Sequence, residues 1–316
     1  MRILVTGVTG FAGGHLAEAL LGRGHEVVGL CRRPEWPAAW AHLAGRVALH
    51  GGDLCDGART EAVLRELRPE AVCHLAGYAH VGRSFREPEA AWAGNLTATL
   101  ALYEAVRRGV GSPRILFVGS GLIYGEPDRP DAALTENCPL RPESPYAASK
   151  AAADLASYQY GRGFGLCIIR ARPFNHIGPR QSPEFAVAHF AGQLAAVERG
   201  ERPPVLETGN LSPRRDLTDV RDVAEAYALL LEKGRPGEAY NVGTGQAWSM
   251  REVLDRLLRL TGLRVEVRQA GGLVRATETA AIRADATRLR QETGWSPRYS
   301  LDQTLADTLD YWRHAP

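Results

Sequence analysis

The stretch RILVTGVTGFAG (Arg2–Gly13) passes from an apolar run directly into a turn with glycine at every third position. Residues 2–6 predict a short buried strand, and the amphipathic run His15–Leu21 after the glycines predicts a helix. Glycine lets the backbone turn sharply and approach a phosphate, which then rests on the amides and the positive dipole of the helix start. The stretch therefore predicts a phosphate-binding turn at the start of an α/β fold.

Beyond this turn, apolar strands alternate with helical segments. Five more strands are predicted before residue 171, at residues 25–30, 47–50, 71–75, 115–118 and 166–170. Such alternation indicates a parallel doubly wound sheet. The proline- and acid-rich segment 126–145 is expected to be a surface loop. After Arg172 the alternation loosens, although a helix at 220–233 and a strand at 239–242 are expected to return to the main sheet.

The predicted fold class is therefore α/β, a Rossmann-type doubly wound parallel sheet with a smaller α+β C-terminal domain. The smaller domain is expected over the carboxyl ends of the strands, where such sheets bind ligands. The predicted division is 1–170 plus 220–243 for the cofactor-binding domain, and 171–219 plus 244–316 for the substrate-binding domain.

Composition argues against several kinds of partner. The 316 residues carry a net charge of +2, which predicts neither nucleic acid nor an anionic membrane as partner. The five cysteines are scattered without a C-x-x-C pair, which predicts reduced thiols, no disulfide framework and no metal site. No apolar run approaches the roughly 20 residues that span a bilayer, and no signal peptide precedes the first strand. We expect a soluble cytoplasmic protein.

The candidate catalytic residues lie around the fifth strand and the segment after it. Tyr146 and Lys150 stand four residues apart on a predicted helix, so their side chains share one face. A lysine ammonium beside a tyrosine is expected to lower the tyrosine pKa, which helps it exchange a proton with a substrate oxygen. Ser120 follows the strand 115–118. Alone, Y-x-x-x-K is also common as a solvated helical turn.

Residues at the strand ends indicate a cofactor. Arg32 and Arg33 end the second strand, where an acid would favour NAD and arginine suits the 2′-phosphate of NADP. A solvated basic turn is the alternative. Asp53 is placed to accept a hydrogen bond from an adenine amino group, and Asn95 to satisfy backbone groups or brace the site. His74, within an apolar run, is predicted to be a core histidine.

Taken together, these elements resemble the extended short-chain dehydrogenase/reductase family. The matching segments follow the family's order: residues 6–13, 53–54, 74–77, Asn95, Ser120, Tyr146-x-x-x-Lys150 and 241–243. Residues 174–179, 209–211 and 215–222 are most similar to the branch of GDP-mannose 4,6-dehydratases and GDP-4-keto-6-deoxy-D-mannose reductases.

The resemblance implies roles for individual residues. The catalytic residues are Ser120, Tyr146 and Lys150. The NADP(H)-binding residues are Gly7, Gly10, Phe11, Gly13, Arg32, Arg33, Asp53, Leu54, Leu75, Ala76, Gly77, Asn95, Tyr146 and Lys150. The nucleotide-diphosphate-sugar substrate is bound by Ser84, Asn175, Asn210, Arg215, Arg275 and Glu278. The resemblance also implies a homodimer, formed by a four-helix bundle of the helices around 89–108 and 145–160.

Within that branch, Leu122 favours a reductase. The dehydratases carry a glutamate two residues after the catalytic Ser or Thr, whereas this chain has Leu122, which has no proton to give. The leading hypothesis is therefore an NADPH-dependent 4-ketoreductase that converts GDP-4-keto-6-deoxy-D-mannose to GDP-D-rhamnose, with the base and the sugar taken from the resemblance. A nucleotide-sugar 4-epimerase with the same triad stays open. So does a cofactor-binding regulatory protein without catalysis.

Overall fold

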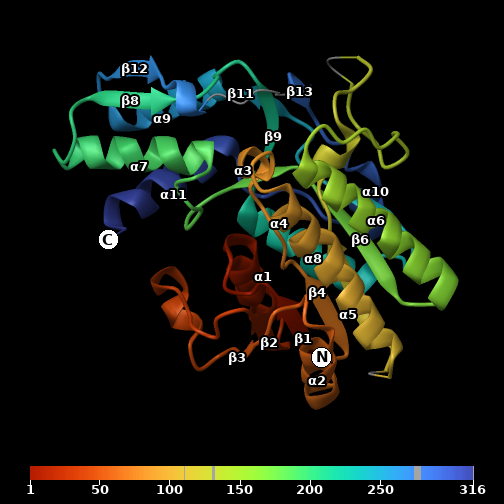
Figure 1. The fold of residues 1–316 in the computed structure, drawn as a ribbon. Coiled ribbons are helices and arrows are strands. Elements are labelled where there is room, and N and C mark those ends of the chain that lie inside the picture. The colour runs from red at the N-terminus through yellow and green to blue at the C-terminus, as the bar shows by residue number, and fades with distance from the viewer. Residues whose placement is uncertain (110, 130–131, 274–278, 316) are drawn as a thin grey trace.

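The computed structural model describes residues 1–109, 111–129, 132–273 and 279–315. Over these residues the main sheet has seven parallel strands in the order β10-β6-β5-β4-β1-β2-β3 (Figure 1). The strands are β1 (Arg2–Thr6), β2 (Glu26–Cys31), β3 (Ala48–Gly51), β4 (Ala71–His74), β5 (Arg114–Val118), β6 (Ile168–Pro173) and β10 (Ala239–Val242). The order reverses direction at β1, so the predicted doubly wound parallel sheet is confirmed.

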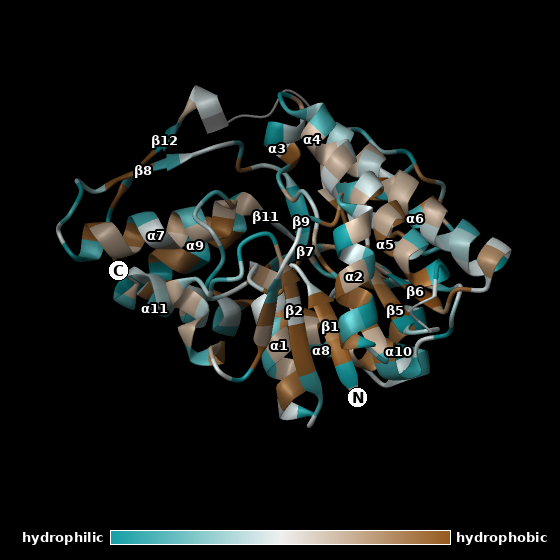
Figure 2. Ribbon diagram, turned by 60° about the horizontal axis from the view of Figure 1, so that its bottom comes forward, coloured by the Kyte–Doolittle hydropathy of each residue, from teal (hydrophilic) through white to brown (hydrophobic). Residues whose placement is uncertain are grey.

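Helices cover both faces of this sheet, because its strands are apolar on both sides (Figure 2). The first face carries α1 (Phe11–Gly22), α8 (Val220–Lys233), α10 (Thr287–Thr293) and the 3₁₀ turn η1 (Ala38–Leu43). The second carries α2 (Gly57–Leu67), α5 (Ala98–Arg107) and α6 (Pro145–Phe164). The strand 239–242 and the helix 220–233 join the main sheet as predicted.

A smaller α+β unit lies over the carboxyl ends of the main strands (Figure 1). Its strands are β7 (Asn175–Ile177), β9 (Arg214–Asp219), β11 (Ala247–Ser249) and β13 (Ala281–Ile282), with the pair β8 (Val205–Thr208) and β12 (Glu266–Gln269). Its helices are α7 (Ala186–Glu198), α9 (Met250–Thr261) and α11 (Leu301–His314), with the 3₁₀ turn η4 (Gly271–Leu273). The three helices, β7, β8, β9, β11 and β12 share one apolar core, whereas Ile282 of β13 packs in a second cluster with Phe174. The domain boundaries drawn from the sequence stay a prediction.

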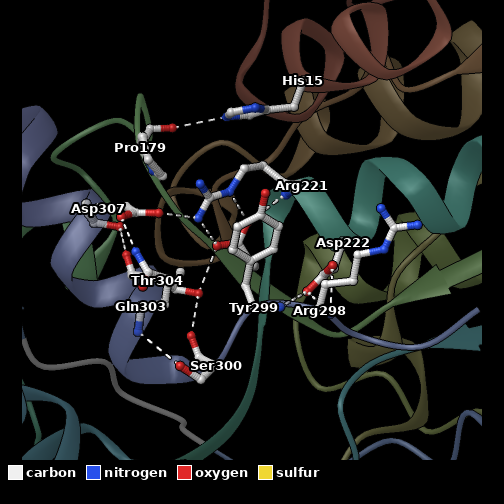
Figure 3. Close-up of polar contacts among 12 residues, drawn as sticks. His15, Pro179, Arg221, Asp222, Arg298, Tyr299, Ser300, Gln303, Thr304 and Asp307 are labelled. Atoms are coloured by element: carbon white, nitrogen blue, oxygen red, sulfur yellow. Dashed lines mark hydrogen bonds and ion pairs between the residues drawn. The ribbon is translucent and has the colours of Figure 1, made fainter. Parts of the chain in front are cut away.

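The two units meet at the start of α8, where buried carboxylates hold the last helix (Figure 3). Arg221 donates to Asp219 and to Asp307 of α11, both at 2.7 Å, and its guanidinium lies 3.7 Å from the ring centroid of Tyr299. Asp222 accepts the backbone N–H of Tyr299 at 3.1 Å. Charge-assisted bonds of this kind are about twice as strong as neutral ones, so the junction is well braced.

No helix in the described part of the chain has both the length and the apolar character needed to cross a bilayer.

Candidate active site

The glycine turn between β1 and α1 is possible only with glycine. Gly7 has a φ of +71°, and a Cβ there would lie 2.9 Å from the backbone of Ala76. A Cβ at Gly13 would lie 2.1 Å from the carbonyl oxygen of Gly7. Gly10 precedes α1 without a side-chain cap, so the first amides of α1 are not covered by a capping side chain. The turn has the backbone features of a phosphate cradle, and the phosphate-binding role drawn from the sequence stays a prediction.

The ends of β2 and β3 lie beside this turn. The Gly7 N–H donates to Leu30 O at 3.0 Å, which places the exposed side chains of Arg32 and Arg33 next to the turn. Asp53 is exposed and accepts the Cys55 N–H at 2.9 Å, whereas Leu54 is buried. A glycine cradle flanked by two exposed guanidinium groups fits a phosphorylated dinucleotide.

Tyr146 stands in the first turn of α6, and local sequence explains why the helix begins there. Ser144 Oγ caps the helix by accepting the Ala147 N–H at 3.1 Å, and Pro145 occupies the first helical position. Lys150 follows one turn later on the same face. The helix therefore aims both side chains in one direction.

Ser120 meets this helix at the end of β5. Its Oγ caps the 3₁₀ turn η3 (Gly121–Tyr124) by accepting the Leu122 N–H at 3.1 Å, and its side chain lies close enough to Tyr146 to lower the pKa of that phenol. Lys150 Nζ donates to Val118 O at 3.0 Å, two residues before Ser120. The structure thus brings the three predicted catalytic side chains together at the carboxyl end of β5.

The pKa of Tyr146 is shifted in the direction opposite to the prediction. Burial raises the pKa of Tyr146, and the hydrogen bond with Ser120 offsets only part of that rise. Lys150 is 7% exposed, and burial lowers its own pKa to about 8. Its ammonium is directed to the Val118 carbonyl. Desolvation therefore sets the direction of the shift, and Tyr146 keeps its proton at neutral pH.

Asn95 braces the catalytic helix from the opposite side. Its Oδ1 accepts the Tyr78 N–H and its Nδ2 donates to Ser149 Oγ, both at 2.9 Å. Ser149 in turn donates to the carbonyl of Tyr146 at 2.8 Å. A Cβ at Gly77 would lie 2.6 Å from Asn95 Oδ1, so glycine is required there. Nothing in the sequence singled out Tyr78 or Ser149, because both act through bonds to distant segments.

The helix predicted over 89–108 is divided into three parts. They are α4 (Pro88–Trp92), the π-helical turn η2 (Ala93–Thr97) and α5. Asn95 lies in the π turn, and such turns are frequent at functional sites. A π turn leaves no periodicity signal over five residues, so the sequence did not reveal it.

His74 is a core histidine, as predicted. It is 2% exposed and bonds to Thr6 Oγ1 at 2.9 Å and to Thr99 Oγ1 at 3.0 Å. Thr99 donates to the Asn95 carbonyl and Thr6 accepts the Ala76 N–H, which assigns the proton of a neutral His74 to Nε2. Burial, with a smaller effect of Lys150, lowers the pKa of His74 to about 3.

Two of the predicted substrate residues share one face of the small sheet. Asn175 pairs with Leu217, and Arg215 lies two residues before Leu217 on β9. Within the described part of the chain, Asn175 Oδ1 is buried without a hydrogen-bond partner. Arg215 is 8% exposed and donates to Thr279 O at 2.8 Å. The amide and the guanidinium are thus neighbours on one face of the small sheet.

The other predicted substrate residues are more scattered. Asn210 is exposed, and its Oδ1 accepts the Ser212 N–H at 3.0 Å. Ser84, in the short helix α3 (Val81–Ser84), is buried and donates to Val81 O at 2.6 Å. Arg275 and Glu278 lie outside the described residues. The substrate contacts of these four residues stay predictions.

Ring contacts also join the two units. The ring of Phe11 stacks on His176 at 5.9 Å. His80 stacks on Phe185 at 5.3 Å and lies 3.3 Å from Glu184. A separate cavity of about 550 Å³ lies between β11, α9 and the start of α11, and no predicted site residue lines it.

Comparisons with known proteins agree with this geometry. The family model described as GDP-mannose 4,6 dehydratase matches residues 4–308. The GDP-6-deoxy-D-mannose reductase of Pseudomonas aeruginosa is 35% identical over 98% of this chain and 97% of its own length. The structure of RMD from Pseudomonas aeruginosa complexed with NADPH has a TM-score of 0.84 and 34% identity, over 99% of this chain and 98% of that one. The Thermus thermophilus UDP-glucose 4-epimerase complex with NAD has a TM-score of 0.89 and 35% identity, over the whole of both chains.

Proposed function

This chain belongs to the GDP-mannose 4,6-dehydratase family, and from that premise we propose that it is an NADPH-dependent 4-ketoreductase of a nucleotide-linked 4-keto-6-deoxyhexose. The proposed reaction converts GDP-4-keto-6-deoxy-D-mannose to GDP-D-rhamnose. The observation that carries the proposal is a complete Ser120–Tyr146–Lys150 site with an apolar residue, Leu122, in contact with its serine.

Each residue of the site has its own role in the proposed reduction. NADPH, when bound, supplies the hydride that reaches the C4 carbonyl. Tyr146 donates its hydroxyl proton to the oxygen of the developing alkoxide, and its raised pKa keeps that proton available. Ser120 donates a hydrogen bond to the same oxygen and stabilises its growing charge. Lys150 would hold the nicotinamide ribose.

Leu122 distinguishes this site from that of a dehydratase. A 4,6-dehydratase must remove the C5 proton and protonate the leaving C6 hydroxyl, which requires acid–base groups beyond the tyrosine. The Leu122 side chain instead packs beside Ile123 and Phe174 in an apolar cluster. Leu122 therefore offers no acid–base group to such a step.

The cofactor assignment rests on Arg32 and Arg33. Their exposed guanidinium groups beside the glycine turn suit a 2′-phosphate, and the similar RMD was crystallised with NADPH. The structural similarity to an NAD-bound UDP-glucose 4-epimerase keeps the epimerase as the second candidate. The arginine pair counts against it, since the cofactor in that structure is NAD.

We further propose a cytoplasmic homodimer. The four exposed apolar side chains that support the dimer lie on α4 and α6, which pack side by side (Figure 1): Trp92, Leu155, Tyr158 and Phe164. A second copy would cover this surface with the same helices and form a four-helix bundle. The cytoplasmic location is supported by the free thiols of all five cysteines, which lie among the described residues.

The test is cofactor consumption. Purified protein with NADPH and GDP-4-keto-6-deoxy-D-mannose should lose the reduced-nicotinamide absorbance in proportion to the product formed. Tyr146→Phe should lower kcat by at least about 100-fold, because the proton donor is gone. Tyr160→Phe is the matched control on the same helix, where the hydroxyl donates to Glu104 instead, and it should keep full activity.

Two results would count against the proposal. Interconversion of nucleotide sugars without net oxidation of NADPH would favour the epimerase. Undiminished turnover by Tyr146→Phe would show that the mechanism is wrong.

A further inference from the structure

A buried polar network lies next to the Ser120–Tyr146 pair and takes no part in the proton transfer described above. At its centre is Arg172 of β6, which is 5% exposed. Its Nε and Nη2 donate to the two carboxylate oxygens of Asp154 at 2.9 and 2.7 Å. Asp154 follows Tyr146 by eight residues on α6, so it lies on the same face of the catalytic helix. Arg172 therefore anchors the helix that carries Tyr146 and Lys150.

The same guanidinium also anchors the element that carries Ser120. Its Nη1 donates to Tyr124 Oη at 2.8 Å, and Tyr124 is the last residue of η3, the turn capped by Ser120. The Tyr124 hydroxyl in turn donates a hydrogen bond to Asn241 Oδ1 at 2.7 Å. One side chain thus contacts both elements that bring the catalytic hydroxyls together.

A third segment joins the network between these two elements. Arg172 Nη1 donates to the Glu136 carbonyl at 3.1 Å, and the Asn241 N–H donates to Glu136 Oε1 at 2.8 Å. Asn241 Nδ2 also donates to Leu134 O at 2.8 Å. The prediction that residues 126–145 form only a surface loop is therefore wrong at their centre. Leu134 is 5% exposed and packs in the apolar cluster beside η3.

We propose that Arg172, Tyr124 and Asn241 are positioning residues that fix η3 against α6 and so hold the Ser120 hydroxyl in place beside Tyr146. A buried ion pair contributes little to stability compared with apolar residues of the same size, so stability alone does not account for this network. Proton transfer is sensitive to placement, since a shift of about 1 Å at a catalytic group can cost on the order of 100-fold in rate. The proposal rests on the proposed function, because turnover is its first readout.

The mildest variant is Tyr124→Phe, which removes one oxygen and leaves the ring packed against Phe174. We expect kcat to fall about 10- to 100-fold, with little change in KM for NADPH, because only the alignment of Ser120 is lost. Tyr103→Phe is the matched control. Tyr103 is also fully buried and bonds to Ser157 at 2.7 Å, away from η3, so its variant should lose similar stability and keep its kcat.

A double-mutant cycle tests whether Tyr124 acts through Ser120. In a Ser120→Ala background the proposal predicts that Tyr124→Phe has no further effect on kcat. An equal loss in both backgrounds, or a wild-type kcat for Tyr124→Phe, would overturn it.

A readout that needs no turnover separates this proposal from the proposed function. NMR of protein labelled with ¹³Cζ-tyrosine measures the pKa of Tyr146, whose signal is assigned by its loss in Tyr146→Phe. We expect this pKa to be higher in Tyr124→Phe than in wild type, because Ser120 lowers it and Ser120 is less well placed in the variant. Tyr103→Phe should leave it unchanged. Wild-type protein that fails to oxidise NADPH would contradict only the proposed function. An unchanged Tyr146 pKa in Tyr124→Phe would contradict the positioning role.

Discussion

At Tyr146 two opposing effects act on one hydroxyl. Burial favours the neutral phenol, and the hydrogen bond from Ser120 favours the phenolate less strongly, so the pKa lies above the ordinary value for tyrosine. A reductase needs the phenol as its acid, whereas an oxidising enzyme needs the phenolate as its base. The surroundings of this side chain therefore agree with reduction as the proposed direction.

We propose that Arg32 and Arg33 select NADPH over NADH. Replacing both with serine should raise the KM for NADPH by about 10- to 100-fold, since a charge-assisted hydrogen bond is worth about 1.5–3 kcal/mol, and should leave the KM for NADH nearly unchanged. Steady-state kinetics with both cofactors measures this. Arg46→Ser is the control, because Arg46 is exposed before the amino end of β3, away from the glycine turn. An equal rise in the KM for NADPH and for NADH would show that Arg32 and Arg33 do not recognise the 2′-phosphate.

At the scale of elements, hydrogen bonds between segments set the position of the catalytic helix. The π turn η2 holds α6 through Asn95 and Ser149, and His74 holds η2 through Thr99. The side chain of His74 therefore connects β4 with the helix layer, even though it takes no part in the chemistry. Its neutral, buried state makes the fold sensitive to acid.

The sign of that sensitivity follows from the pKa of His74, which burial lowers from its ordinary value of 6.5 to about 3 in the fold. Between these values the unfolded chain binds one more proton than the folded one, so stability falls as the pH drops below 6.5. In urea denaturation, wild type should lose about 2 kcal/mol more than His74→Asn between pH 7 and pH 5. Comparing the two proteins removes the contributions of the other histidines to the stability change, because both proteins contain them. Equal losses of stability in wild type and His74→Asn would show that His74 has the same pKa in the folded and the unfolded chain.

For the whole molecule, the exposed apolar surface of α4 and α6 is the feature that the isolated chain leaves uncovered. Leu155 is 58% exposed and Tyr158 is 46% exposed. The double variant Leu155→Glu/Tyr158→Glu should therefore elute as a monomer in size-exclusion chromatography with light scattering, because charges at a bundle interface are costly to bury. Leu260→Glu is the control, since Leu260 is 42% exposed on α9, away from this surface. A monomeric wild type would rule out the proposed bundle.

The sequence by itself determined the sheet, the glycine turn and the spacing of Tyr146 and Lys150. Each depends on neighbours within a few residues: apolar runs of strand length, glycine where the backbone turns at a φ of +71°, and one helical turn between two side chains. The absence of a proton donor at Leu122 is likewise visible in the sequence alone.

Only the tertiary structure decided how these parts meet. The approach of Ser120 to Tyr146, the anchoring of Leu134 and Glu136, and the π turn at Asn95 join segments tens of residues apart. The pKa of Tyr146 shifted opposite to expectation for the same reason. A local pattern shows that Lys150 is near, whereas the cost of desolvation depends on every segment that packs around the pair.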